Sequence, residues 1–163
     1  MPKWYSSNKI KMEKLIVTNT ITIQAPASKV WDILINPQQT KKYMFGCETV
    51  SDWTIGSLLL WRAKHKGNET IYVKGHITAL EPEKYLVYTV FDPHGTIPDI
   101  LENYLTVTYT LSEETNNQTV LTVTQGDYNT VADGERRYNE ANNNGEGWNP
   151  ILVQIKKIAE DEE

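Results

Sequence analysis

The sequence predicts an α+β fold in which a curved antiparallel sheet of about six or seven strands wraps around a long C-terminal helix. A first strand pattern is followed by one or two short helices, and then by a series of strand patterns separated by tight turns. Short connections favour antiparallel pairing, because parallel strands need long crossovers. The chain closes with an amphipathic stretch whose apolar side has only the sheet to pack against.

The N-terminal elements follow from local patterns. Residues 15–23 alternate between aliphatic residues and threonines, and a period of two is typical of a half-buried strand. Pro26 suits the first turn of a short helix, and Pro37 ends that helix. A second short helical turn is expected within residues 38–45.

Further strands are expected after these helices. They cover residues 57–64, 70–80, 84–91, 103–112 and 118–126. In the second of them, strict alternation places one set of residues on the same face, namely Ile71, Val73, Gly75, Ile77 and Ala79. Residues 57–64 carry apolar side chains on both faces, so the pattern leaves open which face lines the interior.

The remaining segments are loops and the closing helix. Residues 92–99 contain two prolines and a glycine and are expected to form a loop. Residues 127–147 are polar, which favours a loop with one or two turns of helix. Pro150 then occupies a first-turn position of the closing helix. The apolar stripe of this helix consists of Trp148, Ile151, Leu152, Ile155, Ile158 and Ala159.

Length and composition place these elements in one domain. A chain of 163 residues fits a single domain with one core. We expect residues 15–160 to form this single domain, residues 1–14 to form a flexible arm, and residues 161–163 to form an acidic tail.

Composition disfavours several classes of protein. The net charge is −5 and the basic residues are scattered, so we expect no nucleic-acid partner. No stretch approaches the ~18 apolar residues of a membrane span. Cys47 is the single cysteine, which excludes an internal disulfide and favours a reducing, cytoplasmic location.

The sequence lacks patterns that indicate a metal site or a reactive nucleophile. The histidines, His65, His76 and His94, have no partner at metal-ligand spacing. Cys47 has no recognisable base, so a structural thiol is expected. We therefore expect no metal, no cofactor and no catalytic residue.

The candidate ligand-binding residues are amides and aromatic residues expected to face the interior. Asn19 and Gln125 interrupt apolar strand faces, and burying an amide without a partner costs about 1–3 kcal/mol. Such an amide is either a satisfied structural group or a polar anchor in an apolar pocket. The aromatic candidates are Trp31, Tyr88, Tyr109 and Trp148. Aromatic residues at such positions are more often plain core, although inward hydroxyls still need partners.

A set of short motifs recurs in the same order as in a known superfamily. The motifs are Ala25-Pro26, Val30-Trp31, Asn36-Pro37, Gly56, Gly75, Glu81-Pro82, Leu86-Val87-Tyr88-Thr89, and Gly147-Trp148 followed by Leu152. With this order of elements, residues 15–160 resemble the START-like (SRPBCC, helix-grip) superfamily, and within it the family named for the activator of the heat-shock protein 90 ATPase. Two departures from the family pattern, Val90 where many relatives carry Trp and Pro150 in the closing helix, would reshape an internal cavity.

The resemblance implies a function as well as a helix-grip fold. In this superfamily the sheet and the closing helix often enclose a cavity for lipids, steroids or other apolar molecules. The resemblance therefore implies non-enzymatic binding of a small apolar or amphipathic ligand. Two alternatives stay open, a chaperone-regulating stress-response module and an enzyme of the cyclase or hydrolase type. A continuous cavity would favour ligand binding, and a large exposed apolar patch would favour the interaction module. A titratable pair inside the cavity would favour the enzyme.

Overall fold

The computed structural model describes residues 13–115 and 117–161. Most of the expected N-terminal arm and the last two residues of the expected acidic tail lie outside this range. Among the described residues, no helix has the length and hydrophobicity needed to cross a membrane.

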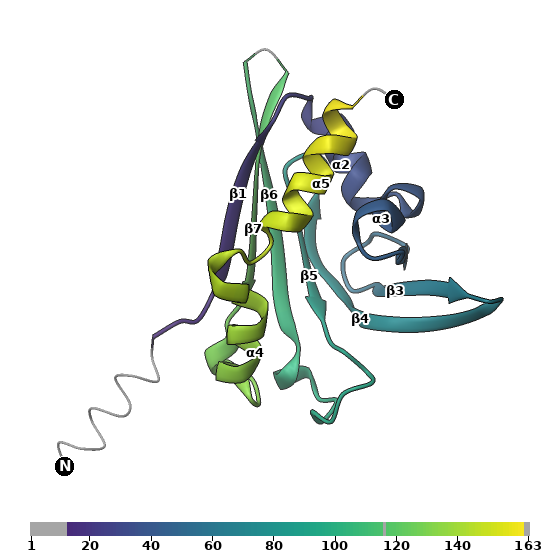
Figure 1. Cartoon of the computed structure of the whole chain (residues 1–163), viewed down its shortest axis with the longest axis vertical. Helices are drawn as coiled ribbons and strands as arrows, with labels where there is room; N and C mark the ends of the chain where they lie inside the picture. Colours follow the sequence, from purple (N-terminus) through teal and green to yellow (C-terminus); the bar gives the residue numbers. More distant parts are fainter. Residues whose placement is uncertain (1–12, 116, 162–163) are drawn as a thin grey trace.

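The strands form a seven-stranded antiparallel sheet in the order β1-β7-β6-β5-β4-β3-β2, so the first strand lies beside the last (Figure 1). The strands are β1 (Val17–Ile23), β2 (Glu48–Ser51), β3 (Leu58–His65), β4 (Asn68–Glu81), β5 (Tyr85–Val90), β6 (Leu105–Glu114) and β7 (Gln118–Gly126). This arrangement confirms the predicted α+β, helix-grip fold. The edge strand β2 is additional to the predicted set, because four residues are too few for a periodic pattern.

Alternation along the long strands separates the core from the solvent. On β6 the buried positions are Leu105, Val107, Tyr109 and Leu111, and the intervening residues are more exposed. The same alternation on β7 buries Leu121 and Val123. The two strands pair over their whole length, so these side chains form one apolar face.

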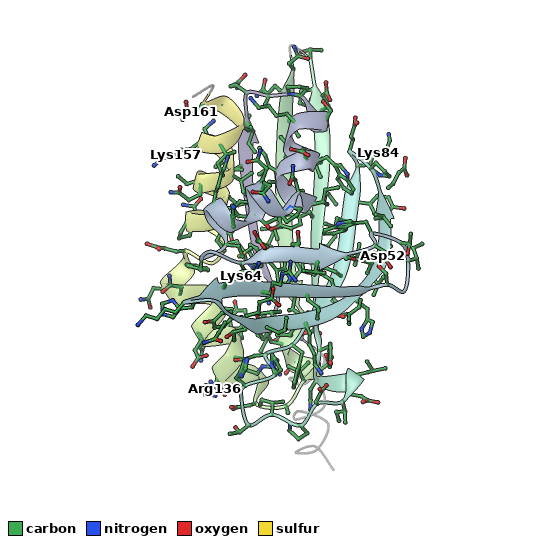
Figure 2. The ribbon with its side chains drawn as sticks, turned by 90° about the vertical axis from the view of Figure 1, so that its right-hand side faces the viewer. Asp52, Lys64, Lys84, Arg136, Lys157 and Asp161 are labelled. Carbon is green, nitrogen blue, oxygen red and sulfur yellow. The ribbon has the colours of Figure 1, made fainter. Side chains whose placement is uncertain are left out.

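Two bulges bend β4 and curl one side of the sheet. The pairing of β3 with β4 shifts after Trp61 and leaves Tyr72 as an extra residue. The pairing of β4 with β5 shifts in the same way at Thr78. Bulges increase local bending and twist. In Figure 2, the bent strands accordingly run across the long strands behind them.

The bulges also change which side chains face the core. The strict alternation predicted for residues 70–80 is wrong at its end, because Leu80 rather than Ala79 packs against the core. On β3, Leu59 and Trp61 are buried, which identifies the inward face that the sequence pattern left open. The side of Trp61 was ambiguous because both faces of this strand are apolar.

The two short helices follow β1 as predicted. They are α2 (Ala27–Ile35) and α3 (Pro37–Tyr43). The side chain of Asn36 accepts a hydrogen bond of 2.9 Å from the backbone N–H of Gln38, which caps the second helix.

The closing helix α5 (Asn149–Glu160) packs on the concave side of the sheet, beside α2 (Figure 1). It buries Leu152, Ile155 and Ala159. The predicted stripe therefore faces the core, with its first residue, Trp148, half-buried at the helix start.

Residues 127–147 contain more helix than the predicted loop with one or two turns. Helix α4 (Gly134–Asn142) has nine residues and is flanked by a 3-10 turn on each side. None of its residues is fully buried. A helix that buries no face needs no apolar stripe, so its sequence carried no periodic signal. Tyr138 and Ala141 instead pack against a small second cluster around Tyr128.

Candidate functional site

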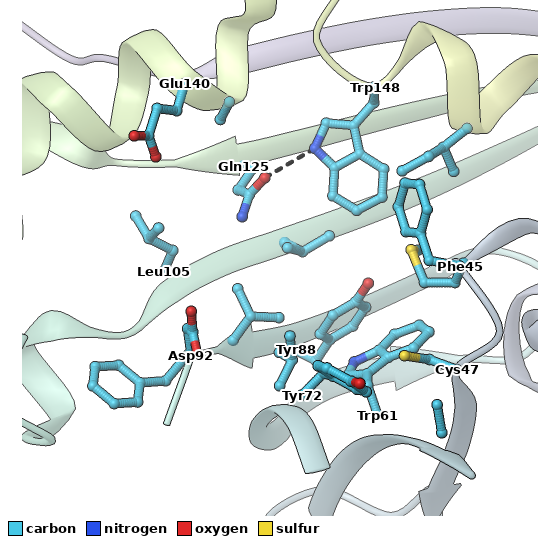
Figure 3. A pocket seen from close by; sticks show the side chains of 18 of the residues that line it. Phe45, Cys47, Trp61, Tyr72, Tyr88, Asp92, Leu105, Gln125, Glu140 and Trp148 are labelled. Carbon is cyan, nitrogen blue, oxygen red and sulfur yellow. Dashed lines mark hydrogen bonds between the residues drawn. The ribbon is translucent and has the colours of Figure 1, made fainter. Parts of the chain in front are cut away.

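A cavity of about 1000 Å³ lies between the concave face of the sheet, the α3–β2 connection and the junction of α4 with α5 (Figure 3). It is partly open to solvent. Its apolar and aromatic wall consists of Met44, Phe45, Cys47, Trp61, Ala63, Tyr72, Val73, Tyr88, Val90, Phe91, Leu105, Val107, Ala141, Trp148 and Ile151. Its polar side chains are Lys64, His65, Asp92, Gln125, Arg137, Glu140 and Asn143. This size and composition are typical of pockets for small ligands.

The sheet supplies a rigid aromatic part of this wall. Trp61 on β3 and Tyr88 on β5 are buried, and their ring centroids lie 6.1 Å apart. Val107 on β6 fills the neighbouring position. Burial raises the pKa of Tyr88 well above its ordinary value, so its phenol stays protonated at neutral pH. This aromatic part of the wall therefore offers apolar contact without a charge of its own.

One amide in the wall is held in a defined orientation. The indole N–H of Trp148 donates a hydrogen bond of 2.9 Å to the side-chain oxygen of Gln125 (Figure 3). An indole nitrogen can only donate, so it selects the oxygen of the amide and directs the amide nitrogen elsewhere. In Figure 3 that nitrogen points away from Trp148 toward the cavity. Gln125 therefore presents hydrogen-bond donors to whatever occupies the cavity.

Asn19 has a different place from the one expected of a pocket anchor. Its side-chain oxygen accepts a hydrogen bond of 2.8 Å from the backbone N–H of Trp148, and its amide nitrogen donates one of 3.1 Å to the carbonyl of Glu146. Both bonds join β1 to the segment that enters α5. Asn19 thus holds the backbone of Trp148 in place, while Asn19 itself is not among the residues that line the cavity.

Tyr109 and Trp31 also lie behind the wall. The ring of Tyr109 meets that of Trp148 edge-on, with centroids 5.9 Å apart. Its buried hydroxyl lies beside that of Tyr88 without a hydrogen bond of normal geometry within the described part of the chain. Trp31 belongs to the core between α2 and its neighbours. Among the candidate residues, the structure therefore brings Tyr88, Gln125 and Trp148 together on the cavity wall.

Sequence reasoning missed several residues that line the cavity. Phe45 is 86% exposed at its rim and has a φ of 55°, a left-handed conformation that is unfavourable for a residue with a side chain. Tyr72 reaches the cavity because it is the extra residue of a bulge. Arg137 comes from α4, in the segment expected to be mainly loop. Its spacing of four residues from Ala141 is the one local signal that these two share a helix face.

The titratable groups of the cavity do not form a metal cluster. Among residues 13–115 and 117–161, no group of three or more His, Cys, Asp or Glu side chains is arranged to hold a metal ion. Cys47 is buried in the wall, and burial raises the pKa of its thiol. A raised pKa keeps the thiol protonated and weakens it as a nucleophile.

Fold and cavity together define a helix-grip protein of the START-like class, and comparison with known proteins refines this assignment. Residues 24–160 match the family described as Activator of Hsp90 ATPase homolog 1-like protein. The match covers more than half of the chain, and the chain belongs to this family. A comparison with curated proteins gave no match.

Solved structures with the same fold include bacterial proteins from several organisms. The solution structure of ChR145 from Cytophaga hutchinsonii is 34% identical, with a TM-score of 0.69, and the alignment covers 92% of this chain and 97% of that one. MLL2253 from Mesorhizobium loti is 20% identical, with a TM-score of 0.68 and coverages of 91% and 98%. The Aha1 dimer from Colwellia psychrerythraea is 18% identical, with a TM-score of 0.63 and coverages of 90% and 96%. The last two comparisons support the fold alone.

Proposed function

We propose that this protein binds a small apolar or amphipathic molecule in the cavity between the sheet and the helices α4 and α5, without converting it chemically. The observation that carries this proposal is a cavity of about 1000 Å³ whose largely apolar wall contains one oriented amide, that of Gln125. Pockets for small molecules combine apolar surface with a few placed polar groups. Apolar contact supplies most of the affinity there, at about 25 cal/mol per Å² removed from water.

The orientation of Gln125 restricts the ligand. Because Trp148 binds the amide oxygen, the amide nitrogen of Gln125 is left to donate to an acceptor on the ligand or in the solvent that reaches the cavity. A carbonyl, hydroxyl or carboxylate oxygen on the ligand accepts such a bond. We therefore expect ligands with at least one oxygen next to an apolar body.

The rim of the cavity supports the same proposal. Phe45 and Tyr72 are large side chains that line the cavity yet remain 86% and 47% exposed. Phe45 also adopts an unfavourable backbone conformation, and its exposed ring adds little to the stability of the core. A bound apolar molecule would contact both rings and remove their exposed apolar surface from water.

The proposal is tested with native mass spectrometry of the freshly purified protein, followed by a panel of fatty acids, sterols and flavonoids. A ligand that binds only the folded state should raise the melting temperature by roughly 5–10 °C at about 100 times its Kd. It should also change the fluorescence of Trp61 and Trp148, which line the cavity. If no compound co-purifies, shifts melting or alters fluorescence, the binding function is excluded.

A second candidate is a chaperone-regulating interaction module, which the family match favours. Exposed apolar side chains outside the cavity, such as Ile55 and Leu101 at 71% and 73% exposure, offer contact points for a protein partner. Stimulation of the ATPase rate of a heat-shock protein 90 by the purified chain would support this function. An unchanged rate at saturating concentrations of the chain would refute it.

A further inference from the structure

We infer that the ligand of the proposed cavity is an amphipathic carboxylate whose head group binds Arg137 on α4. This inference rests on the proposed function and specifies its ligand. It follows from the position of Arg137, from the way its guanidinium is held, and from the absence of an acidic partner among the described residues.

Arg137 lies where two hollows meet. The main cavity adjoins a second hollow of about 590 Å³, and the residues common to both are Phe91, Asp92, Leu105, Arg137, Glu140 and Ala141. Arg137 is half-buried at this junction. An elongated molecule in the main cavity that extends past Leu105 therefore brings its end to the guanidinium.

The guanidinium of Arg137 is held by main-chain groups. Its two terminal nitrogens donate hydrogen bonds of 3.1 and 3.2 Å to the carbonyls of Ala132 and Asn103. Asn103 is itself buried, and its side chain bridges the carbonyl of Pro98 and the backbone N–H of Ala132. An arginine has five N–H donors, so this cradle fixes the plane of the guanidinium while most of its donors stay available.

The acidic side chains closest to Arg137 along α4 are engaged elsewhere. Arg136 forms ion pairs with both Asp133 and Glu140, the latter at 2.9 Å. Asp92, the other carboxylate at the junction, is exposed and accepts a hydrogen bond of 2.8 Å from the backbone N–H of His94. Within the described part of the chain, Arg137 has no ion-pair partner, although acidic residues outnumber basic ones, 21 to 16.

A further donor lies near the guanidinium. Burial raises the pKa of Tyr128 to about 12, and the positive charge of Arg137 opposes this rise, so the phenol stays protonated close to that charge. Tyr128 lines the second hollow together with Arg137. A carboxylate can accept two N–H bonds from a guanidinium side by side, and it is the smallest organic anion with this geometry.

The test compares four probes that share a ten-carbon chain and differ in the head group: decanoate, decanol, decylamine and decyl phosphate, at pH 7 and below micelle-forming concentrations. Isothermal titration should show that the protein binds decanoate about tenfold or more tightly than decanol, the effect of a charge-assisted hydrogen-bond pair. The substitution Arg137→Gln should abolish this preference while decanol still binds, and Arg137→Lys should retain part of it.

The ratio of the two affinities within one variant is the decisive readout, because general damage to the fold weakens both probes together. Lys157→Gln is the matched control, since it removes one positive charge from the outer side of α5 (Figure 2) and should leave the ratio unchanged. Equal binding of decanoate and decanol would overturn the head-group assignment and leave the cavity function intact. A preference for decylamine that depends on Asp92, or a preference for decyl phosphate, would overturn the assignment of the head group as a carboxylate. Failure of all four probes to bind would overturn the inference and would also count against the proposed cavity function.

Discussion

The side-chain oxygen of Asn19 accepts a hydrogen bond of 2.8 Å from the backbone N–H of Trp148, which lies 129 positions later in the chain. This bond ties the first strand to the start of the closing helix. The indole of Trp148 in turn binds Gln125 at 2.9 Å. A short chain of hydrogen bonds therefore transmits the position of β1 to the oriented amide in the cavity.

Replacing Asn19 by Ala should weaken both the fold and the site. The change removes two hydrogen bonds and leaves the N–H of Trp148 and the carbonyl of Glu146 without their partner. We expect the free energy of unfolding to fall by about 1–3 kcal/mol and ligand affinity to fall with it. Urea denaturation and fluorescence titration measure these effects. Thr20→Val, which removes a hydroxyl from the outward side of the same strand, is the control, and equal effects of both changes would contradict the role of Asn19.

Gly147 is required by both its backbone and its surroundings. Its φ is +51°, and an added Cβ would lie 2.4 Å from the Asn19 oxygen and 2.8 Å from a methyl carbon of Val17. Gly147→Ala should therefore cost more than the roughly 1–3 kcal/mol of a strained backbone conformation. Gly145→Ala is the matched control, because its φ is also positive but a Cβ there meets nothing within 4 Å. Thermal unfolding of both variants checks the difference, and equal losses would show that the contact with Asn19 is not tight.

Filling the cavity should block binding without unfolding the protein. Val90 lines the cavity from the end of β5, and Val90→Trp adds a large ring to the partly open space. We expect at least about a tenfold loss of ligand affinity, with a change in unfolding free energy of less than about 2 kcal/mol, because the new ring enters a void. Val87→Trp places the same ring on the outer face of the same strand. If both variants bind ligand like the parent protein, the ligand does not occupy this cavity.

Glu160 should make the stability of the closing helix depend on acidic pH. A hydrogen bond of 2.7 Å from the backbone N–H of Gln24, and then the ammonium of Lys156, lower the pKa of this carboxyl below its ordinary value of 4.5. The folded state then binds the proton less readily than the unfolded state. The stabilising contribution is thus fully present above about pH 5 and is lost as the pH falls through the lower, folded-state pKa.

Glu160→Gln tests this dependence by unfolding in urea at several pH values from about 3 to 7. The variant should be less stable than the parent at neutral pH, and the difference should shrink as the pH falls. Glu83→Gln, in the exposed turn between β4 and β5, measures the effect of removing one carboxylate elsewhere. A difference for Glu160→Gln that stays constant over this range would contradict the prediction.

Local periodicity was sufficient to predict most of the fold. The alternation from Leu105 to Leu111 and the helical stripe with Leu152 and Ile155 indicated buried faces correctly, because the geometry of a single strand or helix determines which of its side chains share a side. These faces then had one way to pack, the helix against the sheet. The order of elements and the family motifs led to the same fold.

The cavity wall, by contrast, depended on contacts between distant segments. The bulge that brings Tyr72 to the cavity beside Trp61 arises from the pairing of β3 with β4, which no single strand pattern reveals. Helix α4 lacks a stripe of its own, so the sequence did not place Arg137 at the cavity.

The sequence by itself determined the class of fold, the buried faces of β6 and α5, and the positions of Asn19 and Gln125 on apolar strand faces, because periodicity within one strand or helix is a local property. Only the tertiary structure decided that one amide supports Trp148 from behind while the other faces the cavity. The physical reason is that a buried amide needs partners, and the identity of those partners is set by which strands and helices meet around it.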